Sequence, residues 1–180
     1  MTQAPAPAAD PCCFVIFGAS GDLTRRLLLP ALYNLAATGL LPERFAIVGV
    51  ARSVHTADEF RQELLDALQA HATRDVDPQL AQRLVAHAAY VSGSIDEAET
   101  FSKLKASLEE IEADAGTQGN RLFYLAMPPD TFEPIARQLA RAGLSQEGAS
   151  GAPWHRVVVE KPFGTDLAGS VANVLFQSFS

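Results

Sequence analysis

The sequence has no long apolar run, and this absence restricts the classes of protein to which the chain can belong. No segment reaches the roughly 18 consecutive apolar residues that a membrane span needs. The opening MTQAPAPAADP has neither the basic start nor the apolar stretch of a signal peptide. We therefore expect a cytoplasmic protein without a membrane partner. Basic residues are also in deficit, and the formal net charge of −7 argues against nucleic acid as a partner.

Cysteine is scarce as well, with Cys12 and Cys13 as the 2 examples. Adjacent cysteines form only a strained disulfide, and the chain has no further cysteine to complete a metal site with them. We expect both thiols to be reduced and no metal to be bound.

Apolar strands alternate with helical patterns after residues 1–11, an Ala/Pro-rich stretch that we expect to be a disordered tail. Runs of β-branched and aromatic residues predict strands over residues 13–17, 45–50, 88–91, 121–126 and 156–160. Nearly continuous apolar strands joined by helices are typical of a buried parallel sheet. The sequence therefore predicts an α/β fold with a doubly wound, mostly parallel sheet and helices on both faces.

The helices are predicted from periodicity and from capping pairs. The first covers residues 22–38 and ends at Gly39, with an apolar face made of Leu23, Leu27, Leu28, Leu32 and Leu35. Another helix follows Pro78. Three pairs have the spacing of a capping box and predict further helix starts: Thr56 with Glu59, Ser94 with Glu97, and Asp130 with Glu133.

The first strand runs into the turn Gly18, Ala19, Ser20 and Gly21, and a helix is predicted to follow at Asp22. In an open α/β sheet the ligand lies beyond the carboxyl ends of the strands, and the first such turn commonly binds a phosphate. Glycine lets a pyrophosphate approach the backbone N–H groups, and the helix start is electropositive. The spacing is neither Gly-x-Gly-x-x-Gly nor a P-loop. A tight turn that needs glycine only for packing is the alternative.

The second strand leads to Arg52, at the position where dinucleotide folds discriminate between cofactors. An acidic residue there binds a ribose 2′-hydroxyl, whereas arginine pairs with a 2′-phosphate. The residue therefore favours NADP over NAD. Arg25 and Arg26 either add charge on the same side or belong to a solvated helix face, and a solvated surface position is the alternative for Arg52 as well.

Two later turns also follow predicted strands. Met127 and Pro128 lie where a strand must turn sharply, either against a flat ring or simply as a rigid turn. Lys161, before Pro162, lies where the nicotinamide end of a dinucleotide would be, and its ammonium can hold a substrate oxygen. Pro162 in the cis form would aim Lys161 inward. A surface turn is the alternative.

At these residues the chain resembles the amino-terminal coenzyme domain of the glucose-6-phosphate dehydrogenase family. The shared segments are GASGDL, LLPALYNL, VGVARS, FYLAMPP and EKPFGTDL, and they occur in the family's order. The resemblance implies a Rossmann-type domain over residues 12–167, with residues 168–180 diverging from the family. It further implies that NADP binds and that glucose 6-phosphate is oxidised to 6-phosphogluconolactone by hydride transfer from C1.

The resemblance also implies roles for individual residues. Lys161 contacts both coenzyme and sugar, and Ser92 and Gly93 are adenosine-side contacts. The remaining residues expected at the coenzyme are Gly18, Ala19, Ser20, Gly21, Asp22, Leu23, Arg52, Met127 and Pro128.

The chain departs from the family in one respect that concerns catalysis. The family's Arg-Ile-Asp-His-Tyr-Leu-Gly-Lys segment, with its general-base histidine, does not occur, and the 4 histidines of the chain are interpreted as surface or loop residues. We therefore expect this polypeptide to bind NADP without turnover, and the resemblance implies no oligomeric state. A non-catalytic module that senses NADP or binds a partner is the alternative. A short-chain reductase would need a Tyr-x-x-x-Lys pair, which the sequence lacks.

Overall fold

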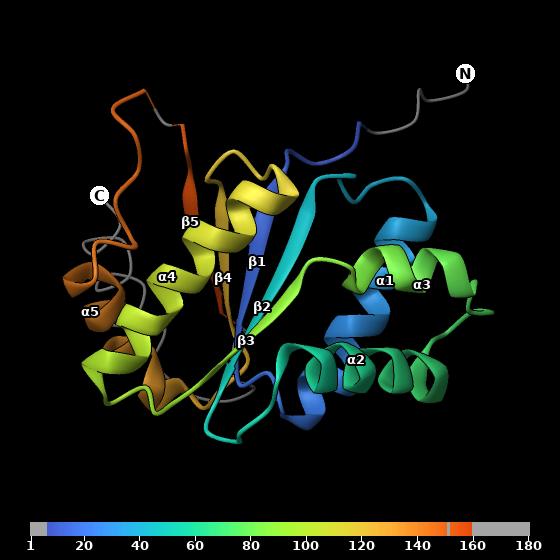
Figure 1. Ribbon diagram of the computed structural model, residues 1–180, viewed down its shortest axis with the longest axis horizontal. Coiled ribbons are helices and arrows are strands. Elements are labelled where there is room, and N and C mark those ends of the chain that lie inside the picture. The colour runs from blue at the N-terminus through green and yellow to red at the C-terminus, as the bar shows by residue number, and fades with distance from the viewer. Residues whose placement is uncertain (1–6, 151, 160–180) are drawn as a thin grey trace.

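The computed structural model describes residues 7–150 and 152–159, which contain a five-stranded, all-parallel sheet (Figure 1). The strand order is β3-β2-β1-β4-β5. The strands are β1 Cys12–Phe17, β2 Phe45–Ala51, β3 Ala88–Ser92, β4 Arg121–Leu125 and β5 His155–Val159. The chain order reverses between the neighbours of β1, so the turn after β1 lies at the topological switch point where α/β sheets bind ligands. The predicted Rossmann-type fold is confirmed.

Both faces of β1 are buried, as its uninterrupted apolar sequence predicts. Alternate side chains enter two separate cores: Phe14 and Ile16 pack on one face, and Val15 and Phe17 on the other. Helices α1 (Leu29–Ala37), α2 (Ala57–His71) and α3 (Pro78–Val85) cover the first face. Helices α4 (Ala98–Ala115) and α5 (Phe132–Arg141) cover the second, so the sheet is covered on both sides (Figure 1).

The first helical segment contains a π turn, η1 (Thr24–Leu28), which leads directly into α1. A π turn holds more residues than an α turn and rotates the side chains that follow it. Leu28 and Leu32 are buried, whereas Leu27 is 63% exposed and Leu35 is 41% exposed. The extent of the predicted helix is close to the observed one, but the assignment of Leu27 and Leu35 to its apolar face was wrong.

One of the three predicted capping boxes forms. At the start of α2, Glu59 N donates to Thr56 Oγ1 at 3.2 Å, and Thr56 N donates to the Glu59 carboxylate at 2.7 Å. The bond from Thr56 N to the carboxylate, together with an interaction between the carboxylate and the Thr56 side chain, lowers the pKa of Glu59. The hydroxyl of Ser94 instead accepts from Asp96 N at 3.3 Å.

The side-chain caps at Ser94 and Asp130 therefore do not form, although a helix begins close to each of the two predicted starts. Helix α4 begins after Glu97, and no side chain caps it. Helix α5 follows a 3₁₀ turn, η2 (Pro129–Thr131), and also has no side-chain cap. Short polar side chains form hydrogen bonds with nearby backbone groups. The Ser94 hydroxyl therefore binds the amide of Asp96 in a local turn and does not cap the helix.

The strands deviate from their predicted bounds by at most one residue within the part of the chain that the structure describes. Strand β2 extends to Ala51, β4 ends at Leu125, and β5 begins at His155. Cys12 and Cys13 are free thiols in the core, which confirms their reduced state. Within the described residues no helix is both long and apolar enough to cross a membrane.

Candidate functional site

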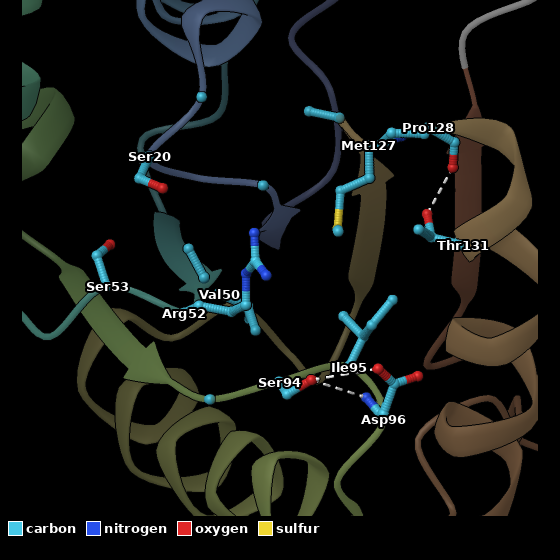
Figure 2. A pocket seen from close by; sticks show the side chains of 15 residues that line it. Ser20, Val50, Arg52, Ser53, Ser94, Ile95, Asp96, Met127, Pro128 and Thr131 are labelled. Atoms are coloured by element: carbon cyan, nitrogen blue, oxygen red, sulfur yellow. Dashed lines mark hydrogen bonds between the residues drawn. The ribbon is translucent and has the colours of Figure 1, made fainter.

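A cavity of about 570 Å³ lies at the carboxyl ends of β1, β2, β3 and β4 (Figure 2). It is the place where an open parallel sheet binds its ligand. Seven of the residues singled out in the sequence line this pocket: Gly18, Ser20, Gly21, Arg52, Gly93, Met127 and Pro128. Eight lining residues were not predicted: Val50, Ala51, Ser53, Ser94, Ile95, Asp96, Ala126 and Thr131.

Gly18 begins the turn after β1 and has a φ of +86°. A Cβ at this position would collide with the backbone oxygen of Ala126 and lie 3.0 Å from the Met127 side chain. Its amide donates to Val50 O at 3.0 Å, which ties the turn to the end of β2. Glycine at this position therefore allows the turn after β1 to meet the end of β2 and the turn after β4.

Some hydrogen-bond donors of the glycine turn bind backbone oxygens of the protein, and others remain available to a ligand in the pocket. The amides of Ala19 and Gly21 donate to Val50 O at 3.3 Å and to Gly18 O at 2.9 Å. Ser20, by contrast, has no hydrogen-bond partner for its amide or its hydroxyl among the described residues. Since Ser20 also lines the cavity, its two donors are available to an anion there.

Three predicted contacts of this turn do not line the cavity. Ala19 is 3% exposed and belongs to the core under α1 and α2. Asp22 is exposed and forms an ion pair with Arg26 at 3.8 Å, while Leu23 is partly buried at the helix start. Of these three residues, Asp22 alone directly follows Gly21, which lines the cavity.

Arg52 follows β2, and Figure 2 shows its guanidinium pointing into the pocket. It is exposed and has no carboxylate partner among the described residues. The two other candidate arginines are paired, Arg25 with Glu63 at 3.6 Å and Arg26 with Asp22 at 3.8 Å. Neither of these two lines the pocket. A cation without a partner at this place can bind an anionic ligand with little competition.

Residues at the end of β3 form the wall beside Arg52. Gly93 lines the cavity, and a Cβ on it would collide with the Thr100 side chain of α4. Ser92 does not line the cavity, but its hydroxyl donates to the carbonyl oxygen of Ser53 at 2.8 Å. Ser53, which sequence reasoning missed, lines the pocket directly after Arg52 in the chain. The position of Ser53 just after the predicted strand over residues 45–50 could have identified it as a pocket residue.

The opposite wall is formed by the turn after β4. Met127 points its thioether into the cavity, and Pro128 lies next to it (Figure 2). The Thr131 hydroxyl donates to Pro128 O at 2.6 Å, which fixes this turn. An apolar wall opposite a cationic one suits a ligand with a flat ring and a phosphate.

The predicted contact Lys161 and the predicted cis bond at Pro162 lie outside the described residues. Within the part of the chain that the structure describes, no histidine lines the pocket. His55 lies near it and contacts Glu63 at 3.2 Å, and His87 contacts Asp114 at 2.8 Å. The interpretation of His155 as a surface or loop residue was wrong, because it is 6% exposed at the start of β5.

Residues 15–177 match the family model described as glucose-6-phosphate dehydrogenase, NAD binding domain. Glucose-6-phosphate 1-dehydrogenase of Chlamydia muridarum is 46% identical over 165 residues, which is 89% of this chain and 32% of that protein. Glucose-6-phosphate 1-dehydrogenase 2 of Mycobacterium bovis is 43% identical over 162 residues, 90% of this chain and 31% of that protein. The chain thus spans about a third of the length of these relatives.

Solved structures show the same relationship. A glucose-6-phosphate dehydrogenase in complex with its substrate glucose-6-phosphate has a TM-score of 0.74 and 31% identity, and the match covers 97% of this chain and 35% of that one. The glucose-6-phosphate 1-dehydrogenase of Mycobacterium avium has a TM-score of 0.71 and 32% identity, with coverage of 94% and 33%.

Proposed function

The chain belongs to the glucose-6-phosphate dehydrogenase family and matches its dinucleotide-binding domain, and we propose that its pocket binds NADP in preference to NAD. The observation that carries this proposal is Arg52, which enters the pocket without a carboxylate partner among the described residues. NADP differs from NAD by a 2′-phosphate on the adenosine ribose. An arginine pairs with phosphate through two parallel N–H donors, whereas a ribose hydroxyl offers it no charge.

The remaining lining residues suit the other parts of the same cofactor. The free amide and hydroxyl of Ser20 are available to the pyrophosphate at the turn after β1, where the helix start adds positive potential. Ser92 and Gly93 lie on the adenosine side with Arg52. Met127 and Pro128 offer an apolar surface toward the nicotinamide side. The adenosine end is therefore assigned to the ends of β2 and β3.

For the whole enzyme we propose the family's reaction, in which glucose 6-phosphate is the substrate and hydride passes from its C1 to NADP, giving 6-phosphogluconolactone. Proton removal from the C1 hydroxyl needs a general base. Among the described residues that line the pocket there is no histidine, and the role proposed for these residues is to bind and orient the cofactor. Lys161 is proposed to contact both the cofactor and the sugar. A non-catalytic NADP-binding module is the second candidate, favoured by the same lack of a base in the pocket.

Calorimetric titration of the chain with NADP and with NAD tests the proposed cofactor. Tighter binding of NADP is expected, and equal affinity for both cofactors would contradict the assignment to NADP. Absorbance of NADPH after addition of glucose 6-phosphate tests whether this polypeptide itself turns over. A preparation free of host enzyme that binds NADP and forms no NADPH supports binding without turnover by this polypeptide. Steady NADPH formation would show that the chain contains its own base.

A further inference from the structure

Tyr90 reaches the edge of the cofactor pocket through another residue. It lies in the middle of β3, and its hydroxyl oxygen is 2.7 Å from Ser53 Oγ. Ser53 lines the pocket directly after Arg52, whereas Tyr90 does not line it. The hydrogen bond therefore links a residue beyond the pocket to the wall where the proposed 2′-phosphate binds.

Ser53 is held at two points by the same strand. Its side chain meets Tyr90, and its carbonyl oxygen accepts from the Ser92 hydroxyl at 2.8 Å. Strand register brings these partners together, because Gly49 pairs with Tyr90 and Ala51 with Ser92. With both its backbone and its side chain bound, Ser53 keeps one orientation beside Arg52.

The ring of Tyr90 is itself fixed by its neighbours. The Phe60 ring packs on it at 5.0 Å between centroids, and the His55 ring meets it edge-on at 5.1 Å. Tyr90 is partly buried. Its hydroxyl therefore has a defined direction, toward Ser53.

The two hydroxyls share one hydrogen bond, and an anion in the pocket decides which of them donates. Burial raises the pKa of Tyr90, so its proton stays in place at neutral pH. When Tyr90 donates to Ser53 Oγ, the Ser53 proton is free to point into the pocket. A hydrogen bond to a phosphate is stronger than one between neutral groups, and bonds in a chain polarise one another. A phosphate therefore favours this direction.

We propose that Tyr90 is a positioning residue for the 2′-phosphate of NADP: Tyr90 donates to Ser53, and Ser53 donates to the phosphate beside Arg52. This inference rests on the proposed function, namely that the pocket binds NADP. NAD carries a hydroxyl in place of this phosphate, so the linked hydrogen bonds from Tyr90 and Ser53 increase its affinity less. Tyr90 thus contributes to cofactor preference without touching the cofactor.

The test compares the NADP and NAD affinities of the chain with those of Tyr90→Phe, Ser53→Ala and the double variant, all by calorimetry. Loss of one neutral hydrogen bond in Tyr90→Phe should lower the NADP to NAD affinity ratio by about 2- to 10-fold. Ser53→Ala removes a charge-assisted bond and should lower the ratio by about 10-fold or more. The double variant should match Ser53→Ala, because Tyr90 acts through Ser53.

Tyr33→Phe is the matched control. The Tyr33 hydroxyl also makes hydrogen bonds, to Asp75 O at 3.3 Å and from Asp77 N at 2.8 Å, but Tyr33 is a buried core residue of α1 and does not line the pocket. Its removal should leave the affinity ratio unchanged. Far-UV circular dichroism checks that each variant is folded. Should Tyr90→Phe not fold, Ser53→Thr, which keeps the hydroxyl, is compared with Ser53→Ala, and only the alanine variant should lose the preference.

The outcomes separate this inference from the proposed function. A wild-type chain without a preference for NADP would contradict both. A wild-type preference that survives in Tyr90→Phe, or a loss of affinity that is equal for both cofactors, would overturn only the role of Tyr90. A preference that survives in a folded Ser53→Ala variant would overturn it as well.

Discussion

Thr24 donates a hydrogen bond from its hydroxyl to the carbonyl oxygen of Gly18 at 3.1 Å, and Thr24 is completely buried. The same carbonyl accepts from Gly21 N at 2.9 Å. Thr24, which belongs to the π turn, thus restrains the glycine turn through a bond to a residue six positions earlier in the chain. Gly18, Ser20 and Gly21 line the pocket, and Ser20 lies between the two glycines. The bond from Thr24 therefore helps to fix this part of the pocket wall.

Thr24→Val removes the hydroxyl and keeps the shape of the side chain. The free energy of unfolding should fall by about 0.5 to 1.5 kcal/mol, as expected for one hydrogen bond. The affinity for NADP should also fall, because the turn loses a restraint. Urea denaturation and calorimetry measure both effects. Thr38→Val is the control, since Thr38 makes a similar bond to Asn34 O at 2.9 Å but is exposed. Equal effects of the two variants on NADP affinity would contradict the role of Thr24.

Gly21→Val should abolish NADP binding while the domain stays folded. Among the described residues, a Cβ at Gly21 meets the Gly18 carbonyl oxygen alone, at 3.1 Å, so a branched side chain extends into the pocket where the pyrophosphate is expected. Gly18→Ala, in contrast, should reduce stability, because φ is +86° and the Cβ meets the Ala126 backbone. Thermal denaturation and NADP titration of both variants separate the two glycines. Cofactor binding by a folded Gly21→Val protein would show that the glycine serves packing only.

Arg52→Ala should remove most of the preference for NADP. A charge-assisted bond from arginine to phosphate contributes about 1.5 to 3 kcal/mol, which a ribose hydroxyl does not match. Arg74→Ala is the control, because Arg74 is exposed and lies between α2 and α3. Calorimetry with NADP and NAD measures the change. The assignment of Arg52 is wrong if both variants keep the wild-type ratio of affinities.

The sheet, the turn after β1 and the place of Arg52 could be predicted because each depends on a short stretch of sequence. A central parallel strand must be apolar on both faces, and β1 is. The turn that follows it lies at the switch point of the sheet whatever the details of the helices. The position of the pocket could therefore be predicted from local sequence patterns alone.

The contacts between distant segments could not be predicted in the same way. Ser53 and Tyr90 are 37 residues apart, and they meet only because the register of β2 against β3 brings them together. The π turn at Thr24 was also missed, because the leucine pattern alone fits a regular helix. Register and local helix geometry are decided by the packing of the whole sheet.

Glu112→Gln should destabilise the domain by about 3 kcal/mol, because it leaves the Arg121 guanidinium without its charge partner in a largely buried place. The two side chains are 11% and 12% exposed, and Arg121 donates to both carboxylate oxygens at 2.7 and 3.0 Å. Lys103→Ala breaks the exposed pair with Glu99 and should change stability little. Urea denaturation of both variants gives the comparison, and similar losses would show that burial of the pair is unimportant.

The stability of the domain should fall as the pH drops below about 6.5, the ordinary pKa of histidine, because of His155. Burial lowers the pKa of His155 in the folded chain, and the nearby Arg121 charge lowers it further. Its Nε2 lies 3.2 Å from Gly119 O, whereas Nδ1 is buried without a hydrogen-bond partner among the described residues. The neutral ring, with its proton on Nε2, can donate to Gly119 O. A second proton, on Nδ1, would be buried without an acceptor among the described residues, so the charged ring is disfavoured.

The unfolded chain therefore takes up a proton at His155 at higher pH than the folded chain. Stability from this group is complete above pH 6.5 and is lost as the pH falls toward the lowered pKa of the folded state, by at most about 1.4 kcal/mol per pH unit. Urea midpoints at pH 7.5 and 5.5 measure the loss in the wild-type chain. In His155→Phe the loss should be smaller, while in His71→Ala, at the end of α2, it should persist because His155 is intact. An equal loss in wild-type and His155→Phe chains would place the responsible proton on another group.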